Sequence, residues 1–469
     1  MKKILSLILI FAFMLTAVSC VNPPEDDESG SNTLTVLLDS ATTAIGFEKD
    51  IQAGIDEMQS SMDAGYTENS VTNRMILENT KLLRDWANSE EITLNCKTWG
   101  WGDSLTNKLQ SAFFAKDTPD IVVGETQMPG FAQRGYLQAF PEDLSNYIKE
   151  NCLSLSYSPM VIDGKIYGIA LSPSVTVLVW NKDMLRRAGV SQSIIDNGPA
   201  NWEEWDAAMA AVAANGENAG GVYTGSGKAD NGAFLRSGTL MLAGGGGFAD
   251  ETGAPDVNSP ENIETFEFIR KMAGYNKPGM LNAQTEDAYF SYFKTGKMAY
   301  YVDGSWAIND AKDLNFDVGY CLMPTKDGSG DGATIAIGCA YLSVPIYAKN
   351  PDKAWELIRF LLSSEVQTNL ARGGARFPAL KSASQTVYSD TSSEYYQEHF
   401  AAFKTLSDAA STQSVTGLPA FAMNNGKLSN LWTAAGQLLG KLADPKNNES
   451  VESLAKAAQA AMMAEWNKK

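Results

Sequence analysis

The chain has 469 residues, 44% of them hydrophobic, which is long enough for two or three domains with sizeable cores. It carries 37 basic and 55 acidic residues, a formal net charge of −18, so its electrostatic field disfavours nucleic acid and anionic lipid surfaces as partners. With a single histidine, His399, the chain offers no histidine-rich metal site and little basis for a Ser-His-Asp catalytic centre.

The N-terminus reads as an export signal. Lys2 and Lys3 precede an apolar run over residues 4–18, which is too short to span a membrane, because a spanning helix needs about 20 apolar residues. Residues 21–32 are rich in proline, acidic residues, serine and glycine, a composition that favours a solvated tether. The sequence therefore predicts a signal peptide over residues 1–19 and an extracytoplasmic mature protein.

Ser19 and Cys20 at the end of the signal resemble the lipobox of bacterial lipoproteins, although Ala17 stands where leucine is more usual. The resemblance implies that Cys20 is acylated and anchors the protein to a membrane, with residues 20–32 as the lipidated tether. The alternative is an ordinary secretion signal with an incidental cysteine. The remaining cysteines are widely spaced, form no CxxC motif and predict no metal or cofactor; we assign them no disulfide pairing: Cys96, Cys152, Cys321 and Cys339.

The first part of the mature chain has a strand, helix, strand pattern. Strands are expected at residues 33–38, 92–98 and 120–124, and residues 103–115 repeat apolar side chains at helical spacing. This order predicts parallel βαβ units, whose ligands bind at the carboxyl ends of the strands. Those ends hold Ser40, Trp99, Trp101 and Glu125.

Later segments continue the alternation of strands and helices. Short strands are expected at residues 165–170 and 176–180, a helix follows the polar cap Asn201, and another begins at Asn350-Pro351. Trp202 and Trp205 lie on one apolar helical face and are expected in the core. No repeat of fixed period is visible, which disfavours solenoids and propellers.

Several motifs follow one another along the chain: the strand at residues 120–124 with FAQRGYL at 131–137, Tyr167-Gly168, WNKD at 180–183, NWEE at 201–204, FKTGKMA at 293–299, DGSWA at 303–307 and the helical region 348–370. In their order and spacing, these motifs resemble the extracellular solute-binding proteins of ABC importers, in the sugar-binding group that includes maltose-binding protein.

This resemblance implies an α/β, two-lobed periplasmic-binding-protein fold, each lobe a mostly parallel sheet flanked by helices, with a hinge and a central ligand cleft. We expect lobe one to comprise residues 33–142 and 322–371, and lobe two residues 143–321 and 372–469. The sequence departs from the family pattern at residues 41–91, where two helices, near 47–61 and 71–88, replace one. The extra helix would cover either the cleft or a partner surface.

A sugar needs aromatic rings against its faces and carboxylates or amides for its hydroxyls. By match to the family's positions, Trp306 is the main stacking candidate, and Trp180 is either a cleft residue or core, because it ends an apolar strand. The full set of predicted ligand-binding residues is Ser40, Trp99, Trp101, Glu125, Tyr167, Trp180, Asp303, Ser305, Trp306 and Arg376.

The sequence thus predicts a non-catalytic, monomeric binding lipoprotein that delivers a sugar or oligosaccharide to an ABC permease. Two alternatives stay open: a secreted glycoside hydrolase that uses two of the many carboxylates, and the same binding fold with a peptide, polyamine or metal chelate as its solute.

Overall fold

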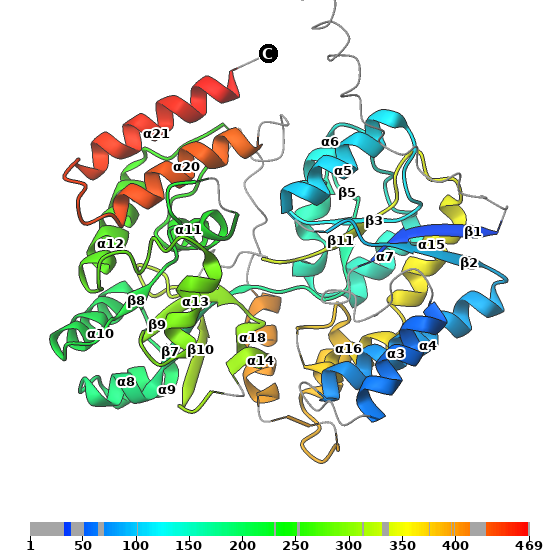
Figure 1. The fold of residues 1–469 in the computed structure, drawn as a ribbon, viewed down its shortest axis with the longest axis horizontal. Helices are drawn as coiled ribbons and strands as arrows, with labels where there is room; N and C mark the ends of the chain where they lie inside the picture. Colours follow the sequence, from blue (N-terminus) through cyan, green and yellow to red (C-terminus); the bar gives the residue numbers. More distant parts are fainter. Residues whose placement is uncertain are drawn as a thin grey trace, which may run out of the picture.

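The computed structural model describes residues 32–38, 51–63, 70–100, 102–228, 231–250, 254–311, 314–330, 337–374, 376–394, 396–397, 399–412 and 428–467. These residues form two lobes that lie side by side and are joined by extended segments (Figure 1). The predicted signal, Cys20, residues 21–31 of the tether, Ser40 and Trp101 lie outside the described residues.

Lobe one is built on strands β1 (Thr33–Leu37), β2 (Thr93–Lys97), β3 (Val122–Gly124), β6 (Ile169–Ala170) and β11 (Tyr341–Ser343). β1 pairs in parallel with β2, and Val36 bridges Ile121 in parallel just before β3. The predicted parallel arrangement of the first three strands is therefore confirmed. β11 runs antiparallel to both of its neighbours, β3 and β6.

Helices cover this sheet. They are α3 (Ile51–Asp63), α4 (Ser70–Ser89), α5 (Gly102–Ala115), α6 (Met128–Gln133), α7 (Glu142–Asn151), α15 (Pro351–Leu361), α16 (Ser364–Gly373) and α17 (Lys381–Val387). Two short 3-10 turns, Ser154–Ser156 and Ser158–Met160, lead into the hairpin of β4 (Val161–Ile162) and β5 (Lys165–Ile166). The two helices expected between the first strands are present as α3 and α4, and α4 packs against α16 as part of the body of lobe one.

Lobe two is built on β7 (Thr176–Asn181), β8 (Gly220–Gly221), β9 (Tyr300–Gly304) and β10 (Val318–Leu322), in the order β10-β7-β9-β8. β7 runs antiparallel to β10 and β9, whereas β8 and β9 are parallel. Each sheet thus has one reversed strand in its interior, a departure from a uniformly parallel sheet. The reversed strands, β7 and β11, are the ones that directly follow a crossing between the lobes.

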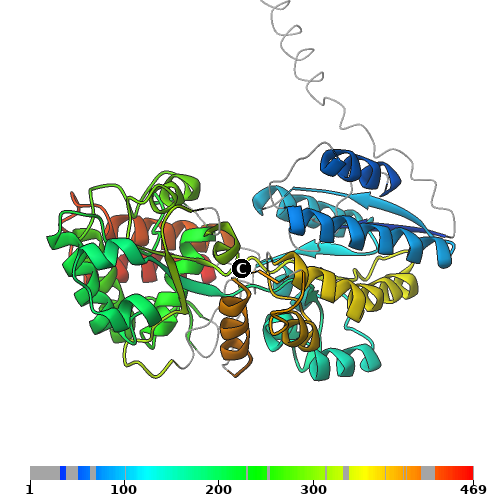
Figure 2. The ribbon, with the colours of Figure 1, turned by 90° about the horizontal axis from the view of Figure 1, so that it is seen from below.

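The helices of lobe two are α8 (Lys182–Arg187), α9 (Gln192–Asn197), α10 (Trp202–Ala214), α11 (Asn231–Ala243), α12 (Pro260–Gly274), α13 (Glu286–Lys294), α14 (Ala307–Asp310), α20 (Leu428–Leu442) and α21 (Val451–Trp466). The predicted helix start at Asn201 is confirmed, because its side chain accepts a hydrogen bond from the Glu204 backbone at 2.9 Å. Figure 2 shows α20 and α21, in red, within lobe two, where they pack on α11 and α12.

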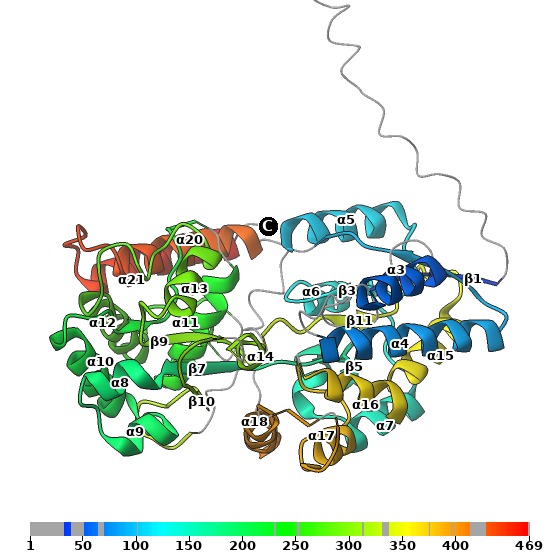
Figure 3. The same cartoon turned by 60° about the horizontal axis from the view of Figure 1, so that its bottom comes forward.

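The lobe boundaries differ from those expected. Residues 143–170 lie in lobe one, because β6 pairs with β11, and the chain crosses after Ala170. Residues 323–330 stay with lobe two, where the Lys326 backbone donates to the Ala243 carbonyl. α17 packs on α16 of lobe one, and α18 (Phe400–Thr412) lies between the lobes at their lower edge (Figure 3). The physical reason is that β6 has two residues, too few to show a periodic pattern.

Candidate functional site

Two crossing segments, residues 171–175 and 337–340, lie side by side between the lobes. The Ile337 backbone N–H donates to the Ser174 carbonyl at 3.1 Å. On the other side, the backbone N–H of Ala379, between α16 and α17, donates to the Leu171 carbonyl at 2.9 Å. Lobe two is also hydrogen-bonded to the crossing segments, because Ser305 donates its backbone N–H to the Val175 carbonyl at 2.9 Å.

Trp306 follows β9 at this junction, and its ring is partly exposed. Two glycines make room for the ring. A Cβ on Gly304 would lie 2.1 Å from the indole, and a Cβ on Gly338 would lie 2.6 Å from it, both closer than real contacts allow. Gly338 also has a φ of +60°, in the left-handed region that favours glycine. The position of Trp306 therefore depends on glycines in two distant segments of the chain.

Three of the predicted residues meet around Gly338. The Arg376 guanidinium lies over the Trp306 ring, 4.9 Å from its centroid, and donates from Nη1 to the Gly338 carbonyl at 2.6 Å. The Gly338 backbone N–H donates to Glu125 Oε1, also at 2.6 Å. Glu125 follows β3 in lobe one and Trp306 follows β9 in lobe two, so this cluster links the lobes.

Asp303 precedes Trp306 by three residues, and its side chain faces other groups of the protein. The residue is 3% exposed, and its carboxylate accepts hydrogen bonds from Arg236 Nη2 at 2.5 Å and from the Gly304 backbone at 2.8 Å. Burial raises the pKa of Asp303, and Arg236 acts against this rise. The structure does not support direct ligand contact by this carboxylate, which corrects the sequence-based expectation.

Ser305 and Trp180 are also enclosed. The Ser305 hydroxyl is completely buried and forms a hydrogen bond with the Ser174 hydroxyl at 2.8 Å. Trp180 is 0% exposed and donates from its indole to the Ile195 carbonyl at 2.9 Å, while the ring lies where a Cβ on Gly319 would stand. The structure thus places Trp180 in the core of lobe two, and we leave it out of the candidate site.

Trp99 and Tyr167 are partly buried against the apolar cluster of lobe one that includes Leu109 and Phe113. They present part of their rings to solvent, as a stacking residue must. Together with Glu125, Trp306 and Arg376 they are the described residues that we retain in the candidate site.

Sequence reasoning missed two residues that shape the site: Gly338, at the centre of the cluster, and Arg236, which pairs with Asp303. Gly338 lies in a short segment between strands, where a lone glycine gives no distinctive pattern. Arg236 had a visible signal: it is a single charge within the apolar stretch of residues 233–241, and it is 2% exposed in the structure. A charge within such a stretch is rarely fully buried unless it is paired.

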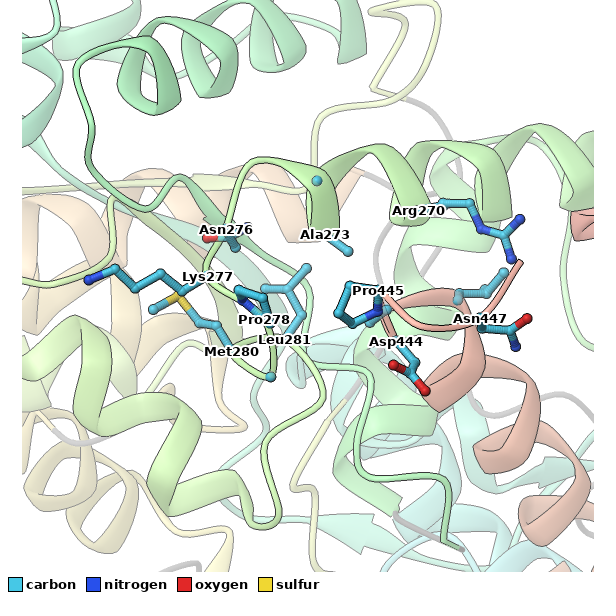
Figure 4. Close-up of a pocket in the computed structure, with 14 residues that line it drawn as sticks. Arg270, Ala273, Asn276, Lys277, Pro278, Met280, Leu281, Asp444, Pro445 and Asn447 are labelled. Carbon is cyan, nitrogen blue, oxygen red and sulfur yellow. The ribbon is translucent and has the colours of Figure 1, made fainter. Parts of the chain in front are cut away.

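Two further hollows lie away from these residues. Figure 4 shows a pocket of about 320 Å³ in lobe two, between the end of α12 and the loop after α20, with Ala273, Pro278, Leu281 and Pro445 among its lining residues. A groove of about 1180 Å³ runs between β10, α14 and α18, with His399 on its wall. Neither is lined by a residue of the predicted site.

The four cysteines that follow Cys20 are free thiols. Within the described residues, no group of three histidine, cysteine or acidic side chains is placed to hold a metal ion. None of the helices that the structure describes combines the length and the apolar character needed to cross a membrane.

Comparison with known proteins agrees with this architecture. The maltotriose-binding protein of Pyrococcus abyssi is 24% identical over 59% of this chain and 58% of its own length. The arabinooligosaccharide-binding protein of Bacillus subtilis is 22% identical over 67% of this chain and 73% of its own.

Solved structures share the fold. The cyclic alpha-maltosyl-1,6-maltose binding protein from Arthrobacter globiformis has a TM-score of 0.67 at 18% identity, covering 92% of this chain and 98% of that one. An ABC substrate-binding protein from Listeria monocytogenes, in complex with cycloalternan, has a TM-score of 0.64 at 18% identity, covering 93% and 99%. The family model described as bacterial extracellular solute-binding protein matches residues 78–368. The two-lobed chain therefore belongs to the family of bacterial extracellular solute-binding proteins.

Proposed function

We propose that this solute-binding protein captures a sugar or oligosaccharide between its lobes and delivers it to an ABC permease, without catalysing a reaction. The observation that carries the proposal is the cluster of Trp306, Arg376 and Glu125 at the junction of the lobes. The names of the relatives support the cargo class, since they bind maltotriose and arabinooligosaccharides.

The chemistry of the cluster suits a neutral sugar. An indole ring offers an apolar face to the C–H bonds of a pyranose, a carboxylate accepts hydrogen bonds from hydroxyls, and a guanidinium donates to ring and hydroxyl oxygens. Trp99 and Tyr167, partly exposed on lobe one, would supply further aromatic contact. One cation and one carboxylate balance each other, so the cluster favours neither a strongly anionic nor a strongly cationic solute.

The placement of the cluster also suits a transport cycle. Glu125 belongs to lobe one and Trp306 to lobe two, so a ligand that contacts both residues would favour closure of the lobes. A carrier must later release its cargo, and a micromolar Kd, about −8 kcal/mol, is sufficient for both steps.

Members of the extracellular solute-binding family act outside the cytoplasm, and we propose that Cys20 carries the lipid that holds this protein at its membrane. The basis is the order of an apolar signal, a small residue, cysteine and a polar segment over residues 4–32. The acidic net charge of −18 gives no electrostatic attraction to anionic lipid, so membrane attachment would depend on the acyl chains.

A thermal-shift screen tests the proposed cargo. The exported protein is heated with monosaccharides and oligosaccharides, and with amino acids, peptides and polyamines as controls. A ligand at 100 times its Kd adds about 2.7 kcal/mol of stability, a rise of several degrees in Tm. A rise with one sugar class and no products supports the proposal. A rise only with the controls contradicts the sugar cargo, and breakdown of a glycoside in the same samples indicates a hydrolase.

A further inference from the structure

Arg236 is a buried cation between two carboxylates. It lies on α11, is 2% exposed, and forms ion pairs with Asp303 on β9 and with Glu286 on α13. Its remaining contacts hold the guanidinium plane: Nε donates to the Val302 carbonyl at 3.0 Å, and Nη1 donates to the Gly232 carbonyl at 3.1 Å. The group is therefore fixed by three elements of lobe two.

Stability alone gives a weak reason for this arrangement. Removing charges from water is costly, and buried ion pairs can often be replaced by apolar residues without loss of stability. The cation also covers an aromatic face, since it lies 4.9 Å from the centroid of Phe290. A buried guanidinium fixes the orientation of the carboxylates that it binds, which an apolar side chain cannot do.

The carboxylate of Asp303 in turn constrains the position of Trp306. It accepts a hydrogen bond from the Gly304 backbone at 2.8 Å, and the Trp306 ring lies directly against Gly304, so the carboxylate holds the turn on which the ring rests. On its other side, the ring meets Gly338 and Arg376, which belong to the crossing and to lobe one. A rotation of the indole would disturb both sets of contacts.

We infer that Arg236 is a positioning residue for the binding site: it orients Asp303, Asp303 holds the turn at Gly304, and this turn sets the orientation in which the Trp306 ring can stack on a sugar. The inference rests on the proposed function, because it takes a sugar as the ligand. The orientation of the Trp306 ring can nevertheless be measured in the absence of any ligand. A purely structural role for Arg236 would instead change stability and leave the indole where it is.

The first test is a double-mutant cycle on sugar affinity, with the exported protein and the sugar found by the thermal screen. Asp303→Asn keeps the shape of the side chain, and Arg236 keeps Glu286 as its partner, so the buried guanidinium still has a carboxylate to balance it. Arg236→Lys keeps the charge and loses the planar fork. We expect either substitution to weaken binding about tenfold, the size of one lost charge-assisted hydrogen bond.

The same substitutions are then made in a Trp306→Ala background, where no ring is left to orient. If Arg236 acts through Trp306, they should change the Kd less than about twofold there, because coupled sites are not additive. A tenfold loss in both backgrounds would contradict the inference. Met209→Ala, a buried change on α10 of the same lobe, is the control for general destabilisation and should leave the Kd unchanged.

The second test needs no ligand. With 5-fluorotryptophan incorporated, the ¹⁹F resonance that disappears in Trp306→Phe is assigned to Trp306. We expect it to shift or broaden in Asp303→Asn and Arg236→Lys, and to stay in place in Met209→Ala. An unchanged resonance would overturn the positioning role even if sugar binds. A shifted resonance in a protein that binds no sugar would retain the positioning role and reject the proposed cargo.

Discussion

At the scale of single residues, the molecule uses its tryptophans in different ways. Trp180 and Trp205 are completely buried in lobe two, whereas Trp306 is partly exposed and has a cation on one face. The difference depends on glycines: Gly319 makes room for a buried ring, and Gly304 and Gly338 make room for a ring at the surface.

We expect Trp306→Ala to weaken sugar binding at least fivefold, because losing a stacked aromatic ring costs about 1 kcal/mol or more. Isothermal titration with the cognate sugar measures this change. Trp86→Ala is the matched control, since Trp86 is also partly buried but stacks on Phe360 within lobe one. An unchanged Kd in Trp306→Ala would remove this residue from the site.

Buried thiols give the protein a stability that depends on pH. Burial raises the pKa of Cys339 from 9.0 to about 11 and that of Cys152 to about 12. The folded pKa is raised, so this stability is present below pH 9, where the unfolded thiol keeps its proton, and is lost as the pH rises toward the folded pKa.

Urea unfolding at pH 8 and pH 10.5 should therefore show a lower free energy of unfolding at the higher pH, by about 2 kcal/mol for each fully buried thiol. Cys339→Ala should reduce the difference between the two pH values by about that amount. Equal differences in the variant and the parent would contradict the assigned cause.

At the scale of elements, the additional region of lobe one is tied to the fold by buried amides. Asn79 on α4 is completely buried, donates to the Val366 carbonyl at 3.2 Å and accepts from Asn369 Nδ2 at 3.1 Å. These bonds reach α16, nearly 300 positions later in the sequence, so α4 is docked to the C-terminal part of lobe one.

Asn79→Ala should lower the free energy of unfolding by about 1–3 kcal/mol, because it leaves a buried carbonyl and amide without this partner. Urea unfolding followed by circular dichroism measures the loss, and sugar affinity should be unaffected. Gln52→Ala, an exposed change on α3, should have little effect. If both variants lose the same stability, the buried amides are not the cause.

Elements with strong local signals could be predicted from the sequence. The first strands, the cap at Asn201 and the two helices before β2 all have periodic or capping patterns within one segment. The position of the crossing after Ala170 and the reversed strands could not be predicted, because they depend on pairings between segments far apart in the chain.

The same division applies to the site. Glu125, Trp306 and Arg376 are site candidates by match to the family's positions, but their mutual contact around Gly338 is a property of the folded chain. Asp303 stands in the same motif as Trp306 and was expected to face ligand. Its role differs because Arg236, which is 67 residues earlier, occupies its carboxylate.

At the scale of the whole molecule, the lipid proposed for Cys20 would determine where the lobes work. We expect Cys20→Ser to abolish the incorporation of labelled palmitate into the exported protein and to release it from the membrane fraction. Ser19→Thr is the conservative control. No residue of the candidate site belongs to the N-terminal segment, so we expect the variant to keep its sugar affinity. Palmitate labelling that persists in Cys20→Ser would reject the anchor.

The strands that follow the crossings, β7 and β11, are each hydrogen-bonded to neighbours on both sides. Pulling the lobes apart would have to break the hydrogen bonds that β7 and β11 make with their neighbours. Rotating the lobes about the crossing segments would not have to break these hydrogen bonds. We therefore expect the molecule to be stiff in extension and compliant in rotation, so that the lobes can open and close without breaking the hydrogen bonds of either sheet.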